Sequence, residues 1–369
     1  MRALAFDPAT TPTDGLAGAV VAEEVRLDGK RRFHKGHRLT GADLADVARL
    51  DCVVHLVRLG ADEVHEDEAG LRLARAAAGP GIELRGPVQS RVNLVAGSKG
   101  LLRVDREPII AINELPGMAL FTLPDRLAVL PGTVLAGAKI TPVAVDGATL
   151  AAAEAIAAAS TVAGSGVAGS GVAGHPVVQL KPFRPLCVGV VSTEGLAGAA
   201  RDRFQAAVRQ KVAWFGGEVL GFVDVRKDAV RFAAEIEAMV ARGADVILTG
   251  GGNTIDPLDP SLLALPLIGA EMVKLGAAAH PGSMFWLAYR GEVPIFNLAS
   301  CSLYSRATVA DLVLPWVFAG ERVTLRDLAE LGVGGLLDKD AAFRFPPYGH
   351  EEQGAGGKEQ RVKGKEVSE

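Results

Sequence analysis

The amino-acid sequence predicts an α/β protein, with a doubly wound, mostly parallel sheet in its second half and a β-rich α+β region before it. The second half alternates short aliphatic runs with stretches of helical period, the order typical of strand–helix–strand units. Four of its predicted strands end in loops of small polar residues. The first half instead holds many short strand-like runs separated by turn residues.

The composition is that of a globular chain with two or three domains, because the chain has 369 residues and a domain typically holds about 100–200. Hydrophobic residues make up 49% and aromatic residues only 5%, so we expect a core of small aliphatic side chains. No apolar run reaches the roughly 18–20 residues of a membrane span, and no secretory signal is evident. The net charge of −4 argues against a nucleic-acid partner. The three cysteines lie far apart and fit reduced thiols, so we expect a cytoplasmic protein.

The first 147 residues are expected to form the β-rich region. Helices are predicted at Thr40–Leu50, which starts with a capping residue type, and at Ala69–Ala78. A strand is predicted at Cys52–Leu59, a turn at Asp28-Gly29 and a hairpin turn at Gly97–Gly100. The other strand candidates are Ile82–Leu84, Arg91–Ala96, Leu101–Val104, Ile109–Asn113, Ala119–Leu123 and Leu135–Val145.

A composition change near residue 175 predicts a domain boundary. The stretch Thr149–Ser160 is rich in alanine and is expected to be helical. A tandem Val-Ala-Gly-Ser-Gly repeat follows it and is typical of a flexible linker. The expected layout is a β-rich region at 1–147, helix and linker at 148–180, an α/β domain at 181–325, an extension at 326–348 and a disordered tail at 349–369.

The predicted α/β domain holds about 140 residues of alternating strands and helices. Its predicted elements are the strand Cys187–Val191, the helix Arg203–Phe215, the strand Glu218–Val223, the helix Asp228–Ala241, the strand Val246–Leu248, a helix within Leu262–Leu275, a strand-to-loop transition at Ala277–Met284, the strand Val293–Leu298 and the helix Ala307–Phe318.

One glycine-rich loop stands out because it directly follows a buried strand. Gly250, Gly251 and Gly252 come after Val246–Leu248, and such a turn at the end of a parallel strand brings amide N–H groups close to a phosphate. The alternative is a plain strand-to-helix connection with a solvated acidic edge. The polar residues that follow the glycines are Asn253, Thr254, Asp256 and Asp259.

Three further strand ends carry small polar residues, at 192–195, 282–283 and 300–302. In open α/β sheets ligands bind at the carboxyl ends of the strands, so we expect these loops to line one site. Glu194, Asp256 and Asp259 add carboxylates there, and carboxylates can hold Mg²⁺ together with waters and a phosphate.

Several of these segments resemble the molybdopterin-binding domain. The resemblance lies in Arg184–Glu194, in Ala244–Thr254 with the two aspartates after it, in His280–Ser283 and in Pro294–Leu298. More loosely, the first half resembles the β-rich domains that precede this module in molybdopterin molybdotransferases of the MoeA and gephyrin E-domain type. Its supporting segments there are Lys35–Thr40 and Pro131–Ala136.

The resemblance implies a role in molybdenum cofactor biosynthesis, in which adenylylated molybdopterin is bound, molybdate is inserted and the nucleotide is released with a divalent metal. It implies an elongated homodimer, and a molybdoenzyme client is a further expected partner. The expected catalytic residues are Asp256, Asp259 and Glu194, and the expected magnesium ligands are Asp256 and Asp259. The expected cofactor-binding residues are Ser192, Thr193, Gly250, Gly251, Gly252, Asn253, Thr254, Pro281, Gly282, Ser283 and Ser300.

Departures from the family pattern leave alternatives open. The third loop of the family usually carries two lysines, whereas this chain has His280-Pro281-Gly282-Ser283. Pterin binding is therefore better supported than molybdate insertion. A non-catalytic molybdopterin-binding chaperone is the first alternative, and a nucleotide hydrolase of the competence-damage-protein type is another. Cys301 is expected to be a buried structural cysteine, with contact to a metal-dithiolene ligand as the alternative.

Overall fold

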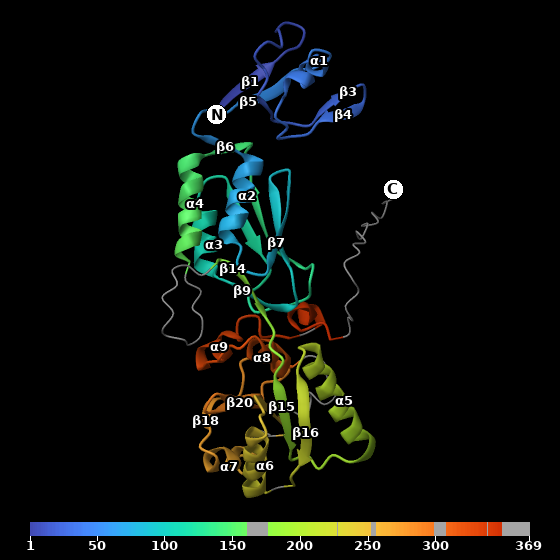
Figure 1. Ribbon diagram of the computed structural model, residues 1–369, viewed down its shortest axis with the longest axis vertical. Coiled ribbons are helices and arrows are strands. Elements are labelled where there is room, and N and C mark those ends of the chain that lie inside the picture. The colour runs from blue at the N-terminus through green and yellow to red at the C-terminus, as the bar shows by residue number, and fades with distance from the viewer. Residues whose placement is uncertain (161–175, 227, 252–255, 299–307, 338, 349–369) are drawn as a thin grey trace.

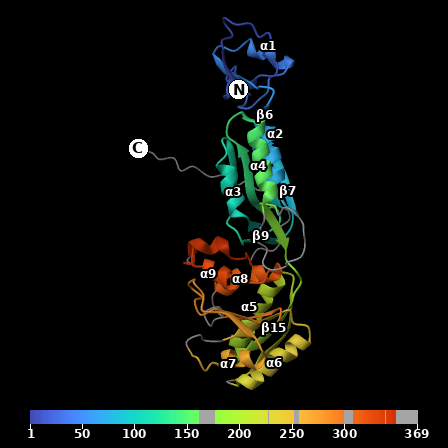
Figure 2. The same ribbon diagram turned by 90° about the vertical axis from the view of Figure 1, so that its left-hand side faces the viewer.

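The structure is a computed structural model that describes residues 1–160, 176–226, 228–251, 256–298, 308–337 and 339–348. The expected linker repeat and the expected disordered tail lie outside these residues. The described part is elongated, with the N-terminal strands at one end, a second β-rich layer in the middle and the α/β sheet at the other end (Figures 1 and 2). The prediction of an α/β fold with a β-rich N-terminal region is confirmed.

The N-terminal end is a small three-stranded sheet with a separate hairpin. The strand order of the sheet is β1-β5-β2, and Phe6, Phe33 and Leu56 fill its core. The expected turn at Asp28-Gly29 is confirmed, since both residues have positive φ between the paired hairpin strands. The elements are β1 Arg2–Phe6, β2 Val20–Val21, β3 Val25–Leu27, β4 Lys30–Phe33, α1 Leu44–Val47 and β5 Val54–Arg58.

Asp43 fixes the turn that leads into α1, and its replacement should weaken this region in a pH-dependent way. Its carboxylate accepts hydrogen bonds from the Thr40 backbone N–H (2.8 Å) and hydroxyl (2.7 Å), and its Oδ2 lies 3.1 Å from His37 Nε2. These contacts, with the backbone bond the largest cause, lower the pKa of Asp43 from 3.8 to about 2. The stabilisation is therefore complete above pH 3.8 and is lost as the pH falls through about 2.

We expect Asp43→Asn to lower the free energy of unfolding by about 1–2 kcal/mol at neutral pH. The difference from the wild type should disappear in acid, as measured by urea unfolding across pH. Asp51→Asn, at an exposed carboxylate, is the matched control and should have no such effect. A pH-independent loss in Asp43→Asn would contradict this account.

The middle region packs three helices on a four-stranded sheet of order β10-β12-β8-β7. A second, three-stranded sheet has the order β11-β9-β14, and β6 pairs with β13 in a two-stranded sheet. The helix after β13 is tied into this core through Leu150, Ala153 and Ala157. The elements are β6 Glu63–His65, α2 Glu66–Ala77, β7 Ile82–Val88, β8 Arg91–Ala96, β9 Gly100–Val104, α3 Arg106–Asn113, β10 Met118–Thr122, β11 Ala128–Val129, β12 Val134–Ile140, β13 Ala144–Asp146, α4 Gly147–Ala159 and β14 Val178–Pro182.

Three predictions for this region are wrong. Ile109–Asn113 is the end of helix α3, because a short apolar run has no period that separates a helix from a strand. Gly97–Gly100 is no hairpin turn, since β8 pairs with β7 and β12 while β9 pairs with β11 and β14. The predicted single strand Leu135–Val145 is divided into β12 and β13, which belong to different sheets.

The α/β sheet has the order β16-β15-β17-β20-β19-β18. Its first four strands are parallel, and β19 and β18 extend it in antiparallel fashion. Helices α5 and α8 cover one face, and α6 and α7 cover the other. The elements are β15 Cys187–Ser192, α5 Gly198–Trp214, β16 Glu218–Asp224, α6 Ala229–Ala241, β17 Val246–Gly250, α7 Pro260–Leu267, β18 Glu271–Leu275, β19 Trp286–Arg290, β20 Val293–Leu298, α8 Val309–Phe318 and α9 Leu325–Glu330.

The antiparallel edge differs from the prediction. The helix within Leu262–Leu275 ends early, at Leu267, as Pro266 predicts; Gly269 follows with a positive φ, and the unpredicted strand β18 takes the remainder. No strand forms within Ala277–Met284. The strand that follows this segment, β19, was not predicted, although Gly291 forms a tight turn between it and β20.

The segment after α8 packs back onto the sheet domain. Leu328, Leu331 and Leu337 join the same core as α5 and α8. Helices α8 and α9 lie between the middle region and the α/β sheet (Figures 1 and 2). There Arg103 of β9 forms a buried ion pair with Glu321, which also binds Lys181 Nζ at 2.8 Å. Within the described residues no helix is long and apolar enough to cross a bilayer.

Candidate functional site

Three neighbouring parallel strands end at one level of the sheet. Gly250 of β17 pairs with Ser192 of β15 on one side and with Leu298 of β20 on the other. The loops that follow these strands therefore leave the same carboxyl edge, which is where open α/β sheets bind ligands.

The structure brings the first two predicted loops into contact. The Thr193 N–H donates to the Gly250 carbonyl at 2.9 Å, and the Glu194 N–H donates to Ser192 Oγ at 3.2 Å. Gly251 has a φ of +96°, and a Cβ there would lie 2.7 Å from both Glu194 Oε1 and Thr193 Oγ1. Only glycine fits this position without displacing those two side chains, so the glycine requirement has a structural cause.

The first loop is also tied to the neighbouring strand β16. The Gly195 N–H donates to Asp224 Oδ1 at 3.1 Å, and Gly195 has a φ of +62°. The Arg226 side chain packs over Gly195, since its Nε lies 3.4 Å from the position of a Cβ there. Arg226 therefore places a guanidinium against the first loop at this edge.

The two aspartates predicted as metal ligands shape the turn into α7. Asp256 Oδ1 accepts a hydrogen bond from the Leu258 N–H, and Asp259 Oδ1 accepts one from the Ser261 N–H, both at 2.9 Å. Asp259 is thus the N-cap of α7. The described residues contain no group of three or more His, Cys, Asp or Glu side chains placed to hold a metal. The magnesium site stays a prediction.

The third predicted loop is held by the C-terminal part of the chain. The His280 N–H donates to the Gly335 carbonyl, and the Leu337 N–H donates to the His280 carbonyl, both at 2.8 Å. Gly282 lies against the start of α8, since a Cβ there would be 2.8 Å from the Val309 nitrogen. His280 is therefore bonded to residues 335–337, Gly282 lies against α8, and the Ser283 carbonyl accepts a hydrogen bond from the Ala277 N–H at 2.9 Å. The predicted residues Gly252, Asn253, Thr254, Ser300 and Cys301 lie outside the described residues.

The sequence analysis missed two buried polar residues in the strands themselves. Thr249 and Asn297 are both fully buried and pair in register on β17 and β20. Asn297 accepts a hydrogen bond from the Trp286 N–H at 2.7 Å and donates one to the Met284 carbonyl at 3.0 Å. The signal for both was a single polar residue within an aliphatic strand run.

It also missed a buried ionic cluster at the start of α8. Asp311 Oδ1 accepts hydrogen bonds from Lys211 Nζ at 2.6 Å and from the Tyr348 hydroxyl at 2.9 Å. Asp311 Oδ2 accepts from the Thr308 hydroxyl at 2.9 Å, which caps the helix. Burial, followed by the negative charge of Asp311, raises the pKa of Tyr348 well above its ordinary value.

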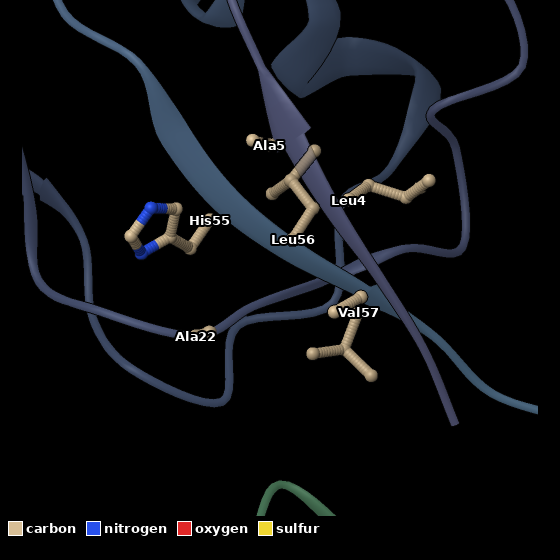
Figure 3. A pocket seen from close by; sticks show the side chains of 7 residues that line it. Leu4, Ala5, Ala22, His55, Leu56 and Val57 are labelled. Atoms are coloured by element: carbon tan, nitrogen blue, oxygen red, sulfur yellow. The ribbon is translucent and has the colours of Figure 1, made fainter.

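A cavity of about 400 Å³ lies elsewhere, in the N-terminal sheet (Figure 3). His55 is its one polar side chain, and His55 Nδ1 lies 3.6 Å from Glu23 Oε1. A ligand site usually has several converging polar groups, so this cavity fits a pterin or nucleotide poorly. Its lining consists of Ala3, Leu4, Ala5, Ala22, His55, Leu56 and Val57.

Comparison with known proteins gives a family for the sheet domain. A model of the family described as "Probable molybdopterin binding domain" matches residues 187–319, from the first residue of β15 to the end of α8. No curated protein matches the chain.

Solved structures with similarity include three proteins of cofactor synthesis. The tungsten cofactor synthesizing protein MoaB of Pyrococcus furiosus is 17% identical, with a TM-score of 0.27 over 32% of this chain and 84% of that one. A molybdopterin biosynthesis protein of Mycobacterium abscessus is 18% identical, with a TM-score of 0.26 over 32% and 83%. The molybdopterin biosynthesis MoeA protein of Pyrococcus horikoshii is 15% identical, with a TM-score of 0.25 over 72% and 80%. The family match shows that residues 187–319 form a domain of the molybdopterin-binding family of molybdenum cofactor biosynthesis.

Proposed function

We propose that this protein binds molybdopterin, or its adenylylated form, at the carboxyl edge of the α/β sheet. The observation that carries the proposal is the contact between the Ser192–Glu194 loop and Gly250-Gly251, within the segment that matches the family. The loops present backbone amides and hydroxyls, which suit the oxygens of a phosphate. Arg226 adds a positive charge at the same edge.

Asp256 and Asp259 are the proposed magnesium ligands. Mg²⁺ is typically held by one or two carboxylates together with waters and substrate phosphates, and this donor set matches that preference. Both residues stand at the start of α7, directly after the glycine loop in the chain. When bound, the ion would neutralise phosphate charge, and the two aspartates would fix its place. Glu194, whose side chain lies against Gly251, is proposed to orient the ligand.

Molybdate insertion is the less supported activity, because the third loop carries His280 and Ser283 where the family usually has lysines. A protein that binds the cofactor and delivers it to a molybdoenzyme client accounts for the same edge without that chemistry. We propose binding as the common step, with insertion and delivery as its two outcomes. A homodimer and a cytoplasmic location remain predictions from the family resemblance and the composition.

The test is anaerobic binding of adenylylated molybdopterin to the full chain, measured by calorimetry with and without Mg²⁺. We expect Mg²⁺ to raise the affinity for the ligand. In Asp256→Asn this Mg²⁺-dependent gain in affinity should be about tenfold smaller, because one charged metal ligand is lost. Asp202→Asn, at an exposed aspartate on α5, is the charge-matched control and should bind like the wild type.

Addition of molybdate then separates the two outcomes. Release of AMP in proportion to protein indicates insertion, whereas retention of the intact ligand indicates delivery. Failure of the folded wild type to bind either form of molybdopterin would overturn the proposed function.

A further inference from the structure

Thr249 carries a buried hydroxyl that makes no hydrogen bond to any described residue. The residue is 0% exposed, and its Oγ1 is one of the few buried side-chain polar atoms without a partner in the described part of the chain. A buried hydroxyl without a partner costs folding free energy, so such a group calls for an explanation. Valine has nearly the same shape and would remove that cost, yet the strand carries threonine.

The position of Thr249 relates this hydroxyl to the proposed site. Thr249 immediately precedes Gly250-Gly251, one residue below the carboxyl edge of β17. Its side chain lies on the same face as Ile247, because residues two apart in a strand share a face. Ile247 packs with Ala264 and Leu265 of α7, so Thr249 faces the side of the sheet that α7 covers.

The described neighbours of Thr249 form no hydrogen bond with its hydroxyl. Val191, its register partner on β15, is apolar. Asn297, its partner on β20, directs its amide to the backbone of the next strand, at Trp286 and Met284. On the α7 side, the Ser261 hydroxyl donates to Asp259 at 2.6 Å.

We propose that the Thr249 hydroxyl donates a hydrogen bond to an oxygen of the bound ligand, on the side of β17 that faces the start of α7. This inference rests on the proposed function and adds a specificity-determining residue to it. The ligand oxygen is either a phosphate oxygen or the ring carbonyl of the pterin, since both accept from a hydroxyl. Among the described residues on this side, Asp256 and Asp259 supply acceptors, and the Thr249 hydroxyl adds a donor to them.

The test compares Thr249→Val with Thr249→Ser in the full chain. Thr249→Val keeps the shape and removes the donor, so we expect about five- to tenfold weaker binding of molybdopterin. The melting temperature of the free protein should stay the same or rise, because an unpaired buried polar group is lost. Thr249→Ser keeps the donor and should bind within about twofold of the wild type. Thr122→Val, at the end of β10, is the matched control and should leave binding unchanged.

Two further probes distinguish the sources of the oxygen. If the acceptor is a phosphate, Thr249→Val weakens binding of AMP with Mg²⁺ and leaves binding of a pterin without phosphate unchanged. If it is the ring carbonyl, the reverse holds. Unchanged molybdopterin binding by a folded Thr249→Val variant overturns this inference alone and leaves the proposed function standing. Absence of molybdopterin binding by the folded wild type overturns both.

Discussion

Lys211→Met should lower the free energy of unfolding by about 3 kcal/mol, because it leaves the Asp311 carboxylate buried without its counter-charge. Asp311 is 0% exposed and the Lys211 side chain 11%, with 2.6 Å between Nζ and Oδ1. The Tyr348 and Thr308 hydroxyls still donate to Asp311 in the variant, which places the loss near the lower end for broken buried ion pairs. Urea unfolding at neutral pH measures it.

Two variants make this prediction specific. Adding Asp311→Asn to Lys211→Met removes the uncompensated charge, so we expect it to recover part of the stability. Arg326→Met removes a cation from an exposed pair with Glu330, and it should leave the free energy of unfolding nearly unchanged because solvent screens such a pair. An equal loss from Lys211→Met and Arg326→Met would contradict a buried-charge origin.

The effect bears on function through the position of Asp311. Asp311 caps α8 through Thr308, the first described residue after the loop that holds Ser300 and Cys301. Tyr348 ties the last described turn of the chain to the same carboxylate. The cluster therefore fixes the start of α8, and we expect Lys211→Met also to weaken ligand binding if the predicted site residue Ser300 contributes to it.

Local pattern was enough to predict the parallel part of the fold. Cys187–Val191, Val246–Leu248 and Val293–Leu298 are aliphatic runs between helical stretches, and the structure confirms each as a strand of one sheet. Ile109–Asn113 shows the limit of prediction from local pattern. Its apolar run fits the period of a helix or of a strand, and packing in the fold favours the helix. Pairing was less predictable still, since β8 and β9 are consecutive yet belong to different sheets.

The candidate site could likewise be predicted only in part. The sequence placed Ser192–Glu194 and Gly250-Gly251 together, because the ends of parallel strands meet at one edge, and the structure brings them into contact. The sequence pattern did not single out Thr249, because what distinguishes this residue is a buried hydroxyl without a described hydrogen-bond partner. It also gave no reason to join Lys211, Asp311 and Tyr348, which come from three distant segments.

Gly282→Ala should lower the free energy of unfolding by about 2–4 kcal/mol, the second large effect we expect. Gly282 has a φ of +114°, which a residue with a Cβ adopts only under strain. The new Cβ would also lie 2.8 Å from the Val309 nitrogen, so either the loop or the start of α8 must move. Urea unfolding measures the loss, and the ligand-induced rise in melting temperature measures its effect on the site.

Gly269→Ala separates backbone strain from the close approach to α8. Gly269 has a φ of +63° with nothing within 4 Å of an added Cβ, so only the left-handed backbone is strained. We expect a loss of about 1 kcal/mol there and an unchanged response to the ligand. A larger loss at Gly282, together with a smaller ligand response, would show that α8 and the third loop must keep their contact for binding. Equal losses at the two glycines would instead reduce the role of Gly282 to its backbone conformation and remove the third loop from the site.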